Sequence, residues 1–195
     1  MQFDTKQLYW INPPEKFKIN STHISFETLP HTDFWQNTYY EFKHDNGHAL
    51  QLKTKELYFS FNVKVSFDTK KRFDQAGIIV YLDSNRWLKA SAEYQDEHTQ
   101  QLGSVVTNHG YSDWTTMNIN GHIKHIWYRL SRRKSDFRIE YSLDGNRYIQ
   151  MRIAHLDLKE EAIVFGFYAC SPEDSTFTAQ FSEFKLTDCI WETHK

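Results

Sequence analysis

The stretch Leu57–Phe67, LYFSFNVKVSF, decides the fold class of this chain. Each odd-numbered position in it holds Leu, Phe or Val, whereas the even-numbered positions hold Tyr, Ser, Asn and Lys. A repeat of two residues places the apolar side chains on one face of a β-strand and the polar side chains on the other. The stretch therefore predicts a long strand whose apolar face packs on a hydrophobic core.

The same alternation recurs along most of the chain, in runs that are separated by short polar turns such as Asp144-Gly145. The expected strands span residues 24–28, 39–43, 48–52, 57–67, 75–82, 87–95, 101–107, 126–132, 137–143, 147–153, 163–170 and 177–186. Helix is nearly absent, and its best candidate is a turn or two around Leu158–Ala162. Many antiparallel strands with short turns predict an all-β sandwich or jelly roll. Neither a linker nor a repeat divides the chain, so we expect residues 1–195 to form a single domain.

The composition argues against several kinds of partner. The net charge of -2 gives no basic field that would attract nucleic acid or an anionic membrane. No apolar run approaches the roughly 18 residues of a membrane-spanning helix, and we see no signal peptide. The two cysteines, Cys170 and Cys189, lack metal-ligand spacing, so we expect reduced thiols in a cytoplasmic protein. We therefore expect no metal and no cofactor.

A second stretch, Trp87–Tyr94 or WLKASAEY, contains good helix formers but lies between two turn sequences, which favours a strand. Its outward face then carries an indole, an ammonium, a hydroxyl and a carboxylate, from Trp87, Lys89, Ser91 and Glu93. In one interpretation, these groups pair across the strands of a solvated sheet. In the other, they belong to a binding surface, where aromatic rings stack on sugar rings and polar groups bind hydroxyls.

Neighbouring segments offer further candidates for the same surface. Gln75 and Arg129 face outward on their expected strands. Asp113 and Trp114 lie in an expected loop after the strand at 101–107, where Trp114 either lines a groove or packs over an edge of the sandwich. His48 follows a predicted turn and is expected to face the groove as well.

Several short motifs occur in an order that resembles a known family. They are Trp10-Ile-Asn-Pro-Pro14, Thr32-Asp-Phe-Trp35, Asp45-Asn-Gly-His48, Phe73-Asp-Gln-Ala-Gly77, Trp87-Leu-Lys-Ala90 with Glu93, Ser104-Val-Val-Thr107, Ser112-Asp-Trp114 and Ala169-Cys-Ser-Pro172. Over about residues 8–188, the chain resembles a bacterial and fungal family of unknown function. That family includes the fungal regulation-of-enolase protein and belongs to the concanavalin A-like lectin/glucanase superfamily.

The resemblance implies a concanavalin A-like jelly-roll β-sandwich of two curved antiparallel sheets, with ligands bound across the concave sheet. It implies no catalytic residue. We place the polar and aromatic positions of the motifs in or beside the concave groove, namely Trp35, His48, Gln75, Trp87, Lys89, Glu93, Asp113 and Trp114.

We therefore expect the concave face to bind a carbohydrate or a sugar derivative. The stacking surface is expected from Trp87 and Trp114. Hydroxyl groups are expected to bind Gln75, Glu93 and Asp113. An acidic or phosphorylated group, as in a sugar phosphate, is favoured by Lys89, Arg129 and His48.

Two alternatives remain open. The first is a glycoside hydrolase or lyase that uses Glu93 together with Glu97 or Asp113. Glycosidases of the superfamily carry an acid triplet on one strand, but Gln95 occupies the middle position here, so the triplet is absent. Lys89 is expected to keep Glu93 ionised. The second alternative is a regulatory module that docks a protein partner such as a metabolic enzyme.

Overall fold

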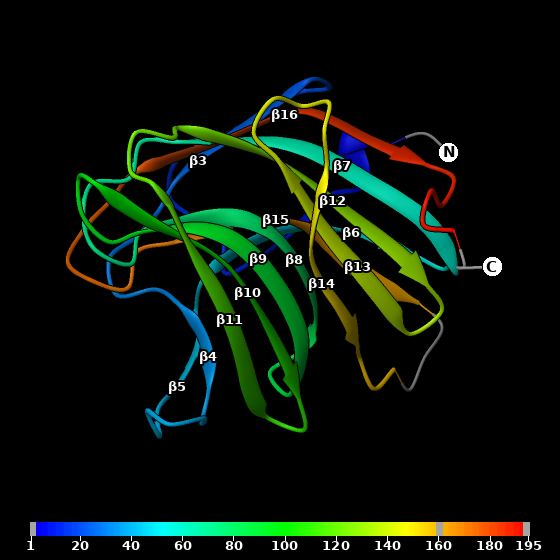
Figure 1. Ribbon diagram of the computed structural model, residues 1–195, viewed down its shortest axis with the longest axis horizontal. Coiled ribbons are helices and arrows are strands. Elements are labelled where there is room, and N and C mark those ends of the chain that lie inside the picture. Colours follow the sequence, from blue (N-terminus) through cyan, green and yellow to red (C-terminus); the bar gives the residue numbers. More distant parts are fainter. Residues whose placement is uncertain (1–2, 159–161, 193–195) are drawn as a thin grey trace.

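The chain folds into two antiparallel sheets that are stacked face to face, as the computed structural model shows for residues 3–158 and 162–192 (Figure 1). The first sheet contains, in spatial order, β1 (Tyr9–Ile11), β6 (His48–Thr54), β15 (Ile163–Cys170), β8 (Gln75–Asp83), β9 (Arg86–Tyr94), β10 (Thr99–Asn108) and β11 (Tyr111–Asn120). The second sheet contains β14 (Ile149–His155), β13 (Asp136–Ser142), β12 (His125–Arg133), β7 (Tyr58–Phe67), β16 (Thr178–Thr187), β3 (His23–Glu27) and β2 (Phe17–Ile19). The predicted all-β sandwich of two curved antiparallel sheets is confirmed.

A hydrophobic core fills the space between the two sheets. On β7 the odd-numbered residues, including Phe59 and Phe61, are fully buried in it, as the alternation predicts. From the facing sheet, Leu88, Ala90 and Ala92 of β9 enter the same core, so WLKASAEY is a strand. Full burial of a large apolar side chain stabilises the fold by about 1.5–3 kcal/mol. The sandwich therefore follows from the period of two in these strands.

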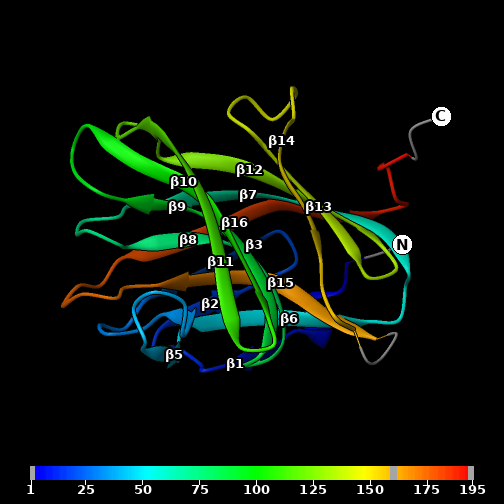
Figure 2. The ribbon, with the colours of Figure 1, turned by 60° about the horizontal axis from the view of Figure 1, so that its bottom comes forward.

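The residues between β3 and β6 depart from the sequence prediction. The expected strand at 39–43 is wrong, because a short hairpin of β4 (Phe34–Gln36) and β5 (Lys43–Asp45) occupies this region, with residues 37–42 as its tip. In the tip, Asn37, Tyr39 and Glu41 have φ angles of 55°, 65° and 59°. These left-handed conformations are incompatible with a strand. The hairpin stands beside the first sheet and lies over one end of its strands (Figure 2).

The edge strand β11 was expected to be a loop at its start, and this expectation is wrong. Its ten residues pair with β10 along their whole length, from Tyr111 opposite Asn108 to Asn120 opposite Thr99. Most of them are exposed, so polar residues occupy both faces and the alternation disappears. The short strands β1, β2 and β4 also escaped prediction, because three residues are too few to show a period.

The remaining expectations concern helix, cysteines and membrane. Among the described residues, the one helical element is a 3-10 turn at Thr5–Gln7, and the expected turn at Leu158–Ala162 falls mostly outside them. Cys170 is a buried free thiol and Cys189 a partly exposed one. No helix in the described parts of the chain is long and apolar enough to span a bilayer. The single-domain and cytoplasmic assignments stay predictions.

Candidate functional site

The strand register of the first sheet creates a hollow on the face that is turned away from the second sheet. Gln75, Glu93 and Gln101 lie opposite one another on β8, β9 and β10 and form one polar row. The next row across the same strands contains Gly77, Ser91 and Gly103. The row beyond it is bulky again, with Ile79, Lys89 and Val105. Small side chains between two rows of larger ones leave a depression, which is part of a pocket of about 370 Å³.

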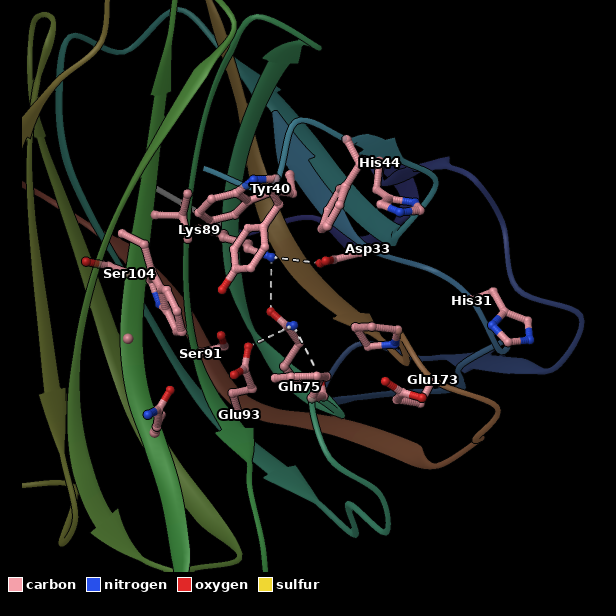
Figure 3. Close-up of a pocket in the computed structure, with 18 residues that line it drawn as sticks. His31, Asp33, Tyr40, His44, Gln75, Lys89, Ser91, Glu93, Ser104 and Glu173 are labelled. Carbon is pink, nitrogen blue, oxygen red and sulfur yellow. Dashed lines mark hydrogen bonds and ion pairs between the residues drawn. The ribbon is translucent and has the colours of Figure 1, made fainter. Parts of the chain in front are cut away.

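Aromatic side chains form one wall of this pocket (Figure 3). Trp35 comes from β4, Tyr40 and Phe42 come from the hairpin tip, and Trp114 comes from β11. The ring centroids of Trp35 and Trp114 are 6.3 Å apart with the planes nearly perpendicular, and Tyr40 lies 5.5 Å from Trp35. Such edge-to-face contacts orient the rings, because the positive edge of one meets the negative face of the other. The pocket therefore has a rigid aromatic side.

The opposite wall is formed by two loops and the start of β8. It includes His31, Phe73, Pro172 and Glu173. The two loops are joined through their backbones, since His31 N donates to Glu173 O at 3.2 Å and Thr32 N donates to Ser171 O at 3.0 Å. This wall is therefore fixed to the end of β15.

A hydrogen-bonded network crosses the floor of the pocket. Lys89 Nζ donates to Asp33 Oδ1 at 3.1 Å and to Gln75 Oε1 at 3.0 Å. The amide of Gln75 in turn donates to Glu93 Oε2 at 3.2 Å, and Gln95 donates to Glu93 Oε1 at 2.9 Å. Figure 3 shows Lys89, Asp33, Gln75 and Glu93 pointing toward one another and joined by these contacts. The network fixes the positions of one ammonium and two carboxylates.

The pKa values of the network follow from burial and charge. Burial alone lowers the pKa of Lys89, but the negative charge of Asp33 and further contributions from Cys170 and Glu93 raise it above its ordinary value. Lys89 therefore stays an ammonium, although it is only 4% exposed. Burial is also the largest effect on Glu93 and raises its pKa from 4.5 to about 7, against the lowering effect of Lys89. Lys89 therefore favours the ionised form of Glu93, as expected, but desolvation outweighs the nearby ammonium and raises the pKa overall.

Residues 10–189 match the family described as protein of unknown function DUF1349. The chain belongs to this family. It is 36% identical to Regulation of enolase protein 1 of Saccharomyces cerevisiae over 178 residues. The matched region covers 91% of this chain and 88% of that protein. A crystal structure of a functionally unknown protein from Saccharomyces cerevisiae superposes with a TM-score of 0.89 and 34% identity, over 97% of this chain and 100% of that one.

More distant structures share the fold of this DUF1349 chain. A mutant of the GH43 protein BlXynB from Bacillus licheniformis matches with a TM-score of 0.71 and 16% identity, over 96% of this chain but 38% of that one. A xylan beta-1,4-xylosidase from Bacillus halodurans matches with a TM-score of 0.66 and 10% identity, over 85% of this chain and 33% of that one. At these identities the likeness concerns the fold alone. The predicted family, which includes the regulation-of-enolase protein, and the predicted β-sandwich fold are confirmed.

Several of the residues that we placed in the groove do line the pocket, namely Trp35, Gln75, Lys89, Glu93 and Trp114. Trp87 does not. It lies on the expected face of β9, but it is fully buried beneath the hairpin, next to Phe34 at a centroid distance of 6.1 Å. Its indole therefore offers no stacking surface to a ligand.

Two other candidates sit on the wrong face of their strands. His48 on β6 points with Leu50 into the space between the sheets, where Nε2 accepts from Leu29 N at 3.0 Å. Its pKa is lowered, mainly by burial. Asp113 precedes Trp114 on β11, and neighbours on a strand point to opposite faces. Asp113 therefore turns away and pairs with Arg152 at 2.6 Å.

Arg129 belongs to the second sheet and lies far from the pocket in the fold. On β12, its guanidinium donates to Asn62 Oδ1 at 3.0 Å and stacks on the Tyr148 ring at 3.6 Å. Glu97, which was considered as a second acid, sits in the β9–β10 turn with a side chain that is 81% exposed. Neither Glu97 nor Asp113 lines the pocket with Glu93, so the expected hydrolase pairs are not formed.

Sequence reasoning missed Asp33, Tyr40, Phe42 and Gln101 as pocket residues. Asp33 stands inside the family motif Thr32-Asp-Phe-Trp35, which is the one signal that marks it. Oδ1 of Asp33 accepts from Lys89 and from Phe34 N at 2.7 Å, whereas no hydrogen bond or ion pair within the described chain engages its Oδ2. This second oxygen can accept a hydrogen bond from a ligand. Among the described residues, no cluster of His, Cys, Asp and Glu is arranged to hold a metal ion.

Proposed function

We propose that this DUF1349 protein binds a neutral carbohydrate in the pocket on the concave face of its first sheet. The observation that carries the proposal is the aromatic wall of Trp35 and Trp114, which faces the polar row of Gln75, Glu93 and Gln101. A sugar ring has apolar C–H faces and a polar rim of hydroxyls. Aromatic rings stack on the faces, while amides and carboxylates bind the rim.

The charges of the pocket favour a neutral ligand over a sugar phosphate. The ammonium of Lys89 is already paired with Asp33 and Gln75, so it offers little to an added phosphate. His48 and Arg129, the other expected cations, do not line the pocket. Glu93 and Glu173 add acidic groups to the lining. Among the described residues that line the pocket, Lys89 is the one Lys or Arg, so a phosphate would meet carboxylates there without a free cation of this kind to offset them.

The proposal is tested by thermal shift and calorimetry with a panel of neutral saccharides. We expect at least one of them to raise the melting temperature of the wild-type protein and to bind with measurable heat. Trp114→Ala removes the accessible indole of the aromatic wall, since Trp114 is 39% exposed and Trp35 only 8%, and should abolish both signals. Its matched control is Tyr111→Ala, because Tyr111 lies on the same strand, is 65% exposed and does not line the pocket. The proposal fails if no saccharide binds, or if binding survives Trp114→Ala.

A second candidate function is regulation by contact with a metabolic enzyme. It is supported by the name of the yeast relative, Regulation of enolase protein 1. It is also supported by the hairpin tip, where Tyr39, Tyr40 and Phe42 are 88%, 49% and 41% exposed. Exposed aromatic side chains are enriched in protein interfaces.

The test for this second function is calorimetry with purified yeast enolase. Tyr39 does not line the pocket, so Tyr39→Ser separates the two functions. Binding that is lost in Tyr39→Ser and kept in Tyr111→Ser supports a docking tip. The absence of heat at concentrations of about 100 μM, which would detect a micromolar complex, rejects it.

A further inference from the structure

The β4–β5 hairpin packs on the concave face of the first sheet, over Trp87. Phe34 on β4 is fully buried, with its ring centroid 5.4 Å from Tyr81 on β8 and 6.4 Å from Tyr168 on β15. With Trp35, it forms a second hydrophobic cluster on the outer side of the first sheet, separate from the core between the sheets. The concave face next to Trp87 is therefore filled by protein and is closed to a ligand.

The hairpin is fastened to the sheet at both sides. Toward the β1 edge, Asn12 Nδ2 donates to Asp45 O at 2.9 Å, and over β8 the hydroxyl of Tyr81 donates to Asp45 Oδ2 at 2.6 Å. Toward the β11 edge, Gln36 N donates to Ser112 Oγ at 2.9 Å and Asn37 Nδ2 donates to Gly110 O at 2.6 Å. The hairpin is thus a strap across the groove.

Other walls restrict the pocket further. On the β15 side, the loops that carry His31 and Glu173 close it. The remaining direction leads past Gln101 on β10, which is partly exposed, to Thr116 and Asn118 on β11, which are exposed. A chain that enters here meets the strap and the network of Lys89 and Asp33 at the far end. Among the described residues, those that line the pocket close the other sides named above and leave this direction as its opening.

From this geometry we infer that the pocket takes the end of a short saccharide, with the chain leaving over β10 and β11, and does not take an internal segment of a polymer. The inference rests on the proposed carbohydrate binding. The volume supports it, since about 370 Å³ is at the small end of the roughly 300–1,000 Å³ of small-molecule sites. A volume at this end of the range suits a short saccharide better than a long one. A longer chain would gain no further contacts inside the pocket.

The experiment is calorimetry on the wild-type protein with matched series of xylose, glucose and mannose saccharides, each with a disaccharide and a linear hexasaccharide. For the series that binds, we expect the two lengths to have dissociation constants within about threefold of each other. The glucose series adds a cyclic hexasaccharide, which has no chain end and should not bind.

The outcomes separate the inference from the proposed function. A hexasaccharide that binds more than about tenfold more tightly than its disaccharide overturns end-on binding and leaves carbohydrate binding intact. Binding of the cyclic glucan would also overturn end-on binding and leave carbohydrate binding intact. If no member of any series binds, carbohydrate binding itself fails and the inference falls with it.

Discussion

Lys89 on β9 and Asp33 before β4 form an ion pair of 3.1 Å between residues that are 56 positions apart. The pair joins the strap to the floor of the pocket. The side chain of Lys89 is 5% exposed and that of Asp33 is 18% exposed, so water stabilises neither charge well. Each charge therefore depends on the other, and together they hold the hairpin above the network of Gln75 and Glu93.

Lys89→Met should lower the free energy of unfolding by about 3 kcal/mol, because it leaves a buried carboxylate without its partner. Urea denaturation at neutral pH measures the change. Asp33→Asn combined with Lys89→Met should recover most of the loss, since no unpaired charge remains. The matched control is Lys64→Met, whose partner Glu183 is 3.7 Å away and 59% exposed. That surface pair should contribute less than about 1 kcal/mol. Equal losses at Lys64 and Lys89 would contradict the role given to the buried pair.

The floor of the pocket could be predicted from the sequence because its residues on β9 occupy alternate positions of the strand. In WLKASAEY, a period of two assigns Lys89, Ser91 and Glu93 to the face opposite the core, and the structure agrees. The errors at His48 and Asp113 lie where the period of two is not the guide: the prediction for His48 rests on the turn before it, and that for Asp113 on an expected loop. Ala49 and Trp114, their neighbours in sequence, are the residues that face the concave side. A slip of one residue exchanges the two faces of a strand.

The cover of the pocket could not be predicted in this way. Trp87 lies on the same face of β9 as Lys89, yet it is buried by a hairpin that precedes it by about fifty positions. No local sequence pattern encodes such a contact. The tip residues Tyr39, Tyr40 and Phe42 have a high strand propensity. Their backbone nevertheless turns through left-handed conformations at Tyr39 and Glu41. Tertiary context decides their conformation.

Phe34→Ala should destabilise the protein by about 3–5 kcal/mol, because the fully buried ring packs against Tyr81, Trp87 and Tyr168. Thermal and urea unfolding measure this loss. The control is Phe42→Ala on the same hairpin, where the ring is 41% exposed and the loss should stay below about 1 kcal/mol. If both changes cost the same small amount, the hairpin is a loose appendage and does not close the groove.

Gly103→Ala should move the indole of Trp114. A Cβ at position 103 would lie 2.9 Å from Trp114 Nε1 and 3.0 Å from Thr115 O, closer than ordinary contacts allow. Because the backbone oxygen is held in the β10–β11 ladder, the indole is the group that shifts. The Trp114 indole N–H resonance in a nitrogen–proton correlation spectrum should change, and it is assigned with Trp114→Phe. Ser91→Ala, in the same row of small residues, should leave this resonance in place. An unmoved resonance in Gly103→Ala would show that the ring does not rest on position 103.

Glu93 makes stability depend on pH. Its pKa in the folded protein, about 7, lies above the ordinary 4.5, because burial disfavours the carboxylate. Folding therefore favours the protonated form. The stability that this form contributes is complete below pH 4.5 and is lost as the pH rises to about 7. The loss is on the order of 3 kcal/mol for a shift of this size.

Glu93→Gln should remove this dependence, since the amide is neutral at every pH tested. The variant should gain stability relative to the wild type between about pH 5 and pH 8, as measured by urea unfolding at each pH. Loss of one of the hydrogen bonds from Gln75 and Gln95 lowers the stability of the variant at all pH values. The informative quantity is therefore the slope of the free energy of unfolding against pH. Glu97→Gln, in the exposed turn of the same β9–β10 hairpin, should keep the wild-type slope. An unchanged slope in Glu93→Gln would mean that water reaches Glu93 and keeps its carboxylate ionised. The floor of the pocket would then not be desolvated, which contradicts the hydroxyl recognition proposed for it.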